Sequence, residues 1–176
     1  MPELTVRSKA RSAMQLNRDA VVEPALPDYR GVFGWPVRWQ ANGLHLVVGS
    51  GIGAVAMPKA QSDAVLAGLE RQDCLGPALA VPTKREMMTI LLVEAELPAW
   101  GEAPPPPSVK VLDAGSAVPL PDRRRPDILA RWIVEPDPQR RWLPALSAVL
   151  ATVRASSPHA LFRPLSTTAP ARLATL

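Results

Sequence analysis

The sequence predicts a single α+β domain with a mainly antiparallel or mixed sheet, packed by two principal helices and flanked by flexible arms. Three observations predict this class. Expected strands outnumber expected helices and come in neighbouring pairs, unlike the strict strand–helix alternation of a parallel sheet. The chain has 176 residues, 47% of them hydrophobic, which is enough for a sizeable core in one domain. Its 21 prolines limit how much of it can be helix interior or central strand.

The two ends are expected to lie outside this domain. We expect an N-terminal arm over residues 1–28 with a helical turn or two near residues 10–16, a globular domain over 29–154, and a disordered, proline-rich tail over 155–176. The formal net charge is +4, and much of it sits in the ends: beyond residue 150 there are three arginines and no acid. Such arms are typical of nucleic-acid contacts or of solvated tails.

The first half of the domain reads as three strands and a helix. Residues 33–40 are rich in β-forming residues but contain Pro36, which predicts an edge strand with Trp35, Val37 and Trp39 on one face. A turn at 41–43 leads to a strand over 44–48, in which His45 is expected to be half exposed. A strand over 52–57 then runs into a helix over 59–72, with Pro58 in its first turn and residues 76–77 as its stop. The inner face of this helix is expected to hold Val65, Leu66 and Leu69.

The second half adds short strands and the clearest helix. Strands are expected over 78–81 and 87–93 around a polar turn, then over 109–112, 116–120 and 130–136. A proline-stiffened loop covers 94–108, and the "PDRRRPD" segment predicts a charged loop. Residues 142–154 predict an amphipathic helix that Trp142 opens. Its apolar stripe comprises Leu143, Leu146, Val149, Leu150 and Val153.

The stretch "LVVGSGIGAVAMPKA" (46–60) raises the question of a phosphate-binding loop. A dinucleotide loop needs the spacing Gly-x-Gly-x-x-Gly and a helix directly after it. Here the glycines stand at every second position, 49, 51 and 53, and Pro58 would clash inside such a helix. The stretch therefore predicts a tight turn between strands, built on glycines that tolerate positive φ.

Composition argues against several kinds of site. One cysteine, Cys74, excludes an intrachain disulfide and a Cys-rich zinc site, and the two histidines give poor material for a metal site or a triad. Hence no cofactor or metal is expected. The acidic pairs Glu94/Glu96 and Glu135/Asp137 are interpreted as solvated strand ends. Without a secretory signal or a membrane-spanning apolar run, the expected compartment is the cytoplasm.

Two basic clusters are the candidate binding residues. Arginines beside an indole can hold phosphates and stack on a base, although a solvated loop is the alternative. The candidates for nucleic-acid binding are Arg123, Arg124, Arg125, Arg140, Arg141 and Trp142.

Six short motifs follow one another in the order of a known family. They are "GWPV" (34–37), "GAVAMP" (53–58), "LGPALAV" (75–81), "GSAVPLP" (115–121), "ARWIVEP" (130–136) and "LPALSAVL" (143–150). Over residues 30–154 the chain resembles a diverged actinobacterial branch of the bifunctional DNA primase–polymerase N-terminal domain, which has an archaeo-eukaryotic primase-like fold. The resemblance implies metal-binding acids on the strand before Pro58 and a histidine on a later strand. Residues 50–62 contain no carboxylate and 85–93 no histidine, so it implies a catalytically inactive relative.

Two hypotheses follow. The first is a non-catalytic primase–polymerase-like protein, a regulatory or accessory factor that contacts a protein partner or nucleic acid through its basic arms and arginine loop. The second is an enzyme with an unrecognised small-molecule site, built around His45, Cys74 and the acids near Glu94. The sequence favours the first, and it leaves the oligomeric state and the partner open.

Overall fold

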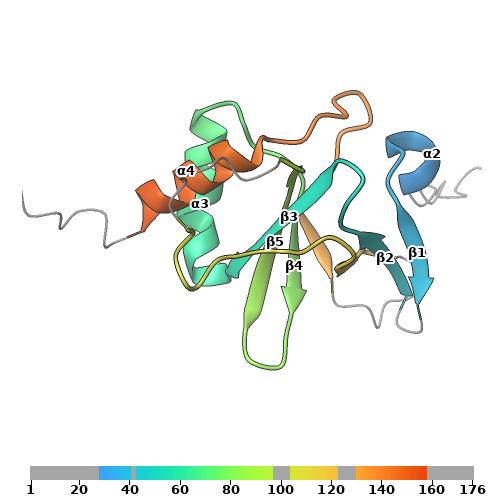
Figure 1. The fold of residues 1–176 in the computed structure, drawn as a ribbon, viewed down its shortest axis with the longest axis horizontal. Helices are drawn as coiled ribbons and strands as arrows, with labels where there is room; N and C mark the ends of the chain where they lie inside the picture. The colour runs from blue at the N-terminus through green and yellow to red at the C-terminus, as the bar shows by residue number, and fades with distance from the viewer. Residues whose placement is uncertain (1–27, 41–42, 97–103, 123–129, 158–176) are drawn as a thin grey trace, which may run out of the picture.

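The computed structural model describes residues 28–40, 43–96, 104–122 and 130–157 (Figure 1). Residues 1–27 of the predicted arm (1–28), with its helical turns, and residues 158–176 of the predicted tail (155–176) lie outside the described residues. The elements are α2 (Tyr29–Phe33), β1 (Val37–Gln40), β2 (Gly43–Val47), β3 (Ile52–Pro58), α3 (Lys59–Arg71), β4 (Ala78–Pro82), β5 (Met87–Glu94), β6 (Lys110–Val111), β7 (Ala117–Pro119), β8 (Arg131–Val134) and α4 (Leu146–Ser156).

The strands form two antiparallel sheets, which confirms the predicted α+β class. One sheet has the order β1-β2-β7 and the other the order β6-β3-β5-β4-β8. A tight turn between β2 and β3 carries the chain from the smaller sheet to the larger one. None of the helices in the described residues is long and apolar enough to cross a bilayer.

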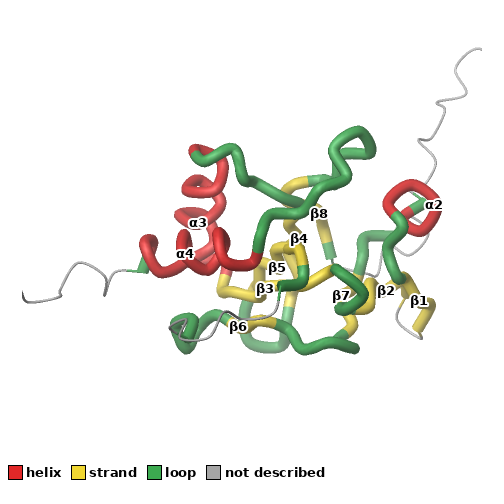
Figure 2. The backbone as a smooth tube through the Cα atoms, turned by 45° about the horizontal axis from the view of Figure 1, so that its top comes forward, coloured by secondary structure: helices red, strands yellow, loops and turns green. Residues whose placement is uncertain are grey.

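Alternation along β3 divides the core between the two faces of the larger sheet. Ile52, Ala54 and Ala56 belong to a cluster shared with the smaller sheet and α2. Val55 and Met57, which point the other way, belong to a cluster shared with α3 and α4. Figures 1 and 2 accordingly show α3 and α4 on one side of the larger sheet, with β1, β2 and α2 on the other. The molecule is therefore three layers deep.

Helix α3 confirms the predicted start, the inner face and, to within one residue, the predicted end at 72, but residues 76–77 are not what stops it. Its inner residues Val65, Leu66 and Leu69 are buried, and Pro58 is its N-cap. The helix ends at Arg71, because Asp73 adopts a left-handed φ of 53° and the amide of Cys74 donates to the carbonyl of Leu69 at 2.9 Å. A left-handed residue directly after the cap is a common way to end a helix.

Helix α4 begins at Leu146, so the prediction that Trp142 opens it is wrong. The backbone at 144–145 instead extends the end of β5: Glu94 N donates to Pro144 O at 2.9 Å, and Glu94 forms a parallel bridge with Ala145. Leu143 packs with the cluster on the opposite face of the sheet from α4. This long-range pairing outweighs the local helical pattern of the segment. The stripe from Leu146 to Val153 is buried as predicted.

The smaller sheet corrects two expectations about exposure. Trp39 does not share a buried face with Trp35 and Val37; its side chain is 63% exposed at the end of the edge strand β1. His45 is buried, not half exposed, because β2 is the central strand of its sheet and the imidazole Nδ1 lies 3.0 Å from Gly43 O. The strand predicted over 33–40 begins only at Val37, and Phe33 instead ends the five-residue helix α2. Asp28 caps this helix by accepting from Gly31 N.

Candidate functional site

The sequence-predicted binding residues divide into two groups. Arg123, Arg124 and Arg125 lie outside the described residues. Arg140, Arg141 and Trp142 lie in the loop between β8 and α4, and all three side chains are exposed. We call residues 140–142 the ridge.

Prolines and two hydrogen bonds within the loop after β8 determine the backbone path that leads to the ridge. Pro136 and Pro138 lack the amide hydrogens that would continue β8, so the strand ends at Val134. The Asp137 carboxylate accepts from Gln139 N at 2.8 Å, and the Arg141 Nε donates to Pro138 O at 3.2 Å. These two bonds close a compact turn. The chain then reaches Pro144, whose pairing with Glu94 anchors the far end of the loop.

The ridge separates two hollows in the surface. The first, of about 290 Å³, is walled by the end of α3, the start of β4 and the loop after β8, and Arg140 and Trp142 contribute to it. The second, of about 340 Å³, is walled by the end of α2, the turn before β3 and the end of β5, and Arg141 and Trp142 contribute to it. Trp142 is 43% exposed and lines both hollows.

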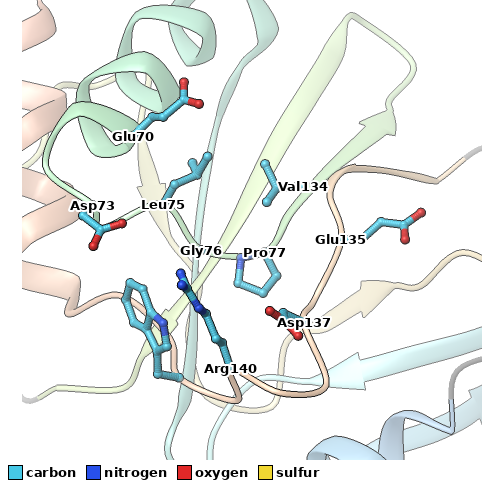
Figure 3. A pocket seen from close by; sticks show the side chains of 10 residues that line it. Glu70, Asp73, Leu75, Gly76, Pro77, Val134, Glu135, Asp137 and Arg140 are labelled. Atoms are coloured by element: carbon cyan, nitrogen blue, oxygen red, sulfur yellow. The ribbon is translucent and has the colours of Figure 1, made fainter.

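We call the first the acidic hollow, because four carboxylates line it. Glu70 and Asp73 come from α3 and the turn after it, and Glu135 and Asp137 come from the loop after β8. Figure 3 shows the side chain of Arg140 extending from this loop toward Gly76 and Pro77, while Glu135 points away from it. Lys59 with Asp63 is the single ion pair between two residues of the described segments, so Arg140 has no carboxylate partner there.

We call the second the aromatic hollow. Its wall includes the rings of Phe33, Trp35 and Trp142, and its polar side chains are Ser50, Glu94 and Arg141. Phe33 and Trp35 are fixed from behind, because their ring centroids lie 4.9 Å apart and Trp35 stacks on Tyr29 at 5.7 Å. The rings on this side of the hollow are therefore held in place by their neighbours. The position of Trp142 is set only by the backbone on either side of it.

The glycine-rich stretch forms one edge of the aromatic hollow. Ser50 and Gly51 have φ of 52° and 91°, and the amides of Gly49 and Ile52 bond to each other's carbonyls at 2.8 and 3.1 Å. These values define a two-residue hairpin turn with positive φ at both central positions. The predicted glycine turn is confirmed, and it places Ser50 and Gly51 at the surface facing the ridge.

The other residues considered for chemistry are dispersed. His45 lies in the smaller sheet and Cys74 packs on the helix side of the larger one, and neither lines either of the two hollows. Glu96 accepts from Ser147 N at 3.2 Å and so caps α4, while Glu94 faces the aromatic hollow. Within the segments that the structure describes, no group of three or more His, Cys, Asp or Glu side chains is arranged to hold a metal ion.

The strand on which the resemblance places catalytic acids is β3. It lies between β6 and β5 in the larger sheet, and its residues from Ile52 to Met57 are all buried. Every one of them is apolar or glycine. This strand supplies core packing to both layers.

Sequence reasoning identified the ridge but missed both hollows. The aromatic hollow combines segments near residues 33, 51, 94 and 142, which no local pattern connects. One signal was available: Ser50-Gly51 before a buried strand is a hairpin turn, and it forms one edge of this hollow. Comparison of the chain with models of protein families, with curated proteins and with solved structures found no match.

Proposed function

We propose that this protein is a non-catalytic, primase–polymerase-like domain that acts as an accessory or regulatory factor, and that it contacts a protein partner through the ridge. The observation that carries the proposal is the exposed indole of Trp142, which directly follows Arg140 and Arg141 and lines both hollows. Tryptophan and arginine are the residues that most often dominate the energetics of protein interfaces. A large ring that leaves about two fifths of its surface in water gains by burial against a partner.

The charges around the ridge favour a protein over a nucleic acid. Arg140 lines the acidic hollow together with four carboxylates, and Arg141 lines the aromatic hollow together with Glu94. A phosphate backbone would approach these acids at close range, and nucleic-acid affinity depends on the neutralisation of phosphates by lysine and arginine. A polypeptide can meet acids and arginines at once with side chains of both signs.

The test is affinity capture from extracts of the source organism, followed by binding of the purified candidate partner to the purified chain. We expect Trp142→Ala to weaken binding to that partner at least tenfold, as a central interface tryptophan does. Trp39→Ala is the matched control, because Trp39 is the other strongly exposed tryptophan of the described residues and lies on β1, away from the ridge. Equal effects of the two substitutions, or none, would contradict the proposed surface.

Nucleic-acid binding is the second candidate, and the motif of two arginines beside an indole favours it. A mobility-shift titration with single- and double-stranded DNA and RNA at two salt concentrations distinguishes the two. Binding that falls steeply with salt and weakens in a variant with Arg123, Arg124 and Arg125 changed to Ala would replace a protein partner with nucleic acid.

A further inference from the structure

The aromatic hollow has the size of a small-molecule site. Its volume of about 340 Å³ lies at the lower end of the range of ligand pockets, about 300–1,000 Å³. Its apolar contact surface comes chiefly from Phe33, Trp142 and Leu143, because Trp35 and Ile52 are almost fully buried. More of the exposed surface of the hollow is polar than apolar, so charged and polar groups on a ligand can find partners in it.

Two side chains of opposite charge line this hollow without forming an ion pair with each other. Glu94 and Arg141 both line the hollow, and they do not form an ion pair with one another. The Glu94 backbone is fixed by Pro144 and Ala145, and the Arg141 Nε is held by Pro138 O, so both chain positions are set by hydrogen bonds. The remaining N–H groups of the Arg141 guanidinium, and both Glu94 oxygens, have no partner in the described part of the chain.

This arrangement selects the ligand's charge pattern. A ligand with a single charge would pair with only one of these two side chains. The other charged side chain would lie against an uncharged part of the ligand and lose water without gaining an ion pair. A ligand with both an anionic and a cationic group satisfies both. Its cation also lies near the indole of Trp142, whose face attracts positive charge.

We propose that the aromatic hollow binds a small zwitterion with a large apolar or aromatic side group, the chemistry of a free α-amino acid such as phenylalanine. Its carboxylate pairs with Arg141, its ammonium group pairs with Glu94, and its side chain packs against the rings of Phe33 and Trp142. This site is additional to the protein-contact function and does not depend on it.

The experiment is calorimetric titration of the full chain with L-phenylalanine and three analogues that each lack one feature. We expect a Kd of about 1 mM or lower for phenylalanine, the range that ordinary binding energy per ligand atom gives for a molecule of this size. Phenylalaninamide lacks the carboxylate, N-acetylphenylalanine lacks the ammonium group, and glycine lacks the side chain. Each analogue should bind about tenfold more weakly or worse.

Variants assign each charge to its partner. The Arg141→Gln variant should bind phenylalanine and phenylalaninamide with equal affinity, because the carboxylate has lost its partner. The Glu94→Gln variant should bind phenylalanine and N-acetylphenylalanine with equal affinity, because the ammonium group has lost its partner. Arg38→Gln is the control, since Arg38 is exposed on β1 and lines neither hollow, and this variant should bind phenylalanine as the natural chain does. Thermal melting confirms that each variant is folded.

Two results would overturn the proposal: no heat of binding for phenylalanine up to about 10 mM, well above the expected Kd, or equal affinity for phenylalanine and both charge-deleted analogues. Neither result bears on the partner-capture experiment, whose readout is the effect of Trp142→Ala on a protein partner. A failure of the small-molecule site is therefore distinguishable from a failure of the proposed function.

Discussion

The two faces of the larger sheet are covered by different chemistry. On the helix side, the cluster among the described residues consists of aliphatic side chains with Met57 and Cys74. On the other side, the cluster includes four aromatic residues: Tyr29, Phe33, Trp35 and Trp132. Two regular helices close the first face, whereas a three-stranded sheet and a five-residue helix cover the second.

This difference explains where the aromatic hollow forms. Small and branched aliphatic residues interdigitate, and they let α3 approach α4 closely at Gly68. Rigid rings can pack only in a few relative orientations, so short covering elements leave gaps beside them. The aromatic hollow lies at such an edge, beside Phe33 and Trp35. The helix side thus supplies stability, and the aromatic side supplies both stability and an accessible surface.

The largest expected effect separates two tryptophans that share that hollow. Trp35 is 5% exposed and stacks on Tyr29, so Trp35→Ala should lower the free energy of unfolding by about 3–5 kcal/mol. Trp142→Ala should lower it by less than about 1 kcal/mol, because 43% of Trp142 is already exposed to water. Urea unfolding followed by circular dichroism measures both. Similar losses of stability in the two variants would show that Trp142 is part of the core. The distinction between a buried and an exposed tryptophan in this hollow would then no longer hold.

A second experiment tests the close approach on the helix side. A Cβ on Gly68 would lie 2.7 Å from Thr152 Cγ2, and the Thr152 hydroxyl is held by Ala148 O at 3.0 Å and by Gln72 Nε2 at 3.2 Å. The methyl group therefore cannot rotate away freely. Gly68→Ala should cost about 1–3 kcal/mol in crowding, more than the gain of about 1 kcal/mol in helix propensity.

Thr152→Ser supplies the matched control, because it removes the methyl group and keeps the hydroxyl. In that background, Gly68→Ala should become stabilising, and a double-mutant cycle by urea unfolding should give a coupling free energy of about 1–3 kcal/mol. Additive effects of the two substitutions would mean that the helices are not in contact at this point.

A smaller effect is expected for the polar link within the aromatic cluster. The indole Nε1 of Trp132 donates to the hydroxyl of Tyr29 at 3.0 Å in a partly buried position. Tyr29→Phe keeps the ring stack and removes this acceptor, so the free energy of unfolding should fall by about 1 kcal/mol. Phe33→Tyr is a control that adds a hydroxyl to the same cluster without touching this bond. No change in Tyr29→Phe would indicate that water replaces the tyrosine hydroxyl.

The sequence predicted those features that rest on local patterns. The helix beginning after Pro58, the hairpin of β4 and β5, and the glycine turn all follow from spacing and turn residues within one segment. The start of α4 did not, because the strand-like pairing of Pro144 and Ala145 with Glu94 joins segments about fifty residues apart. The prediction that Trp39 shares a buried face with Trp35 and Val37 failed for a related reason. Alternation identifies the two faces of a strand, but the neighbouring elements decide which positions on a face are buried.

The same limit applies to the site. Residues 140–142 were identified from composition, since arginines next to an indole are conspicuous in any sequence. The presence of Glu94 and Arg141 in the same ring-lined hollow could not be predicted from composition. It depends on how the end of β5 lies beside the loop that follows β8. The charge balance on which the proposal of a protein partner rests depends equally on Glu70 at the end of α3 and Asp73 in the turn after it.

The smallest expected effect concerns the turn that joins the two sheets. Ser50 has a φ of 52°, in the left-handed region that costs most residues with a Cβ about 1–2 kcal/mol. Asparagine adopts this region more readily, and Asn-Gly is the preferred pair for such a hairpin. Ser50→Asn should therefore raise the free energy of unfolding by about 0.5 kcal/mol, and Ser50→Val should lower it by about 1 kcal/mol, since a β-branched residue resists positive φ. If urea unfolding shows Ser50→Val to be neutral, the turn relaxes without cost, and the edge of the aromatic hollow that it forms is not preorganised for a ligand.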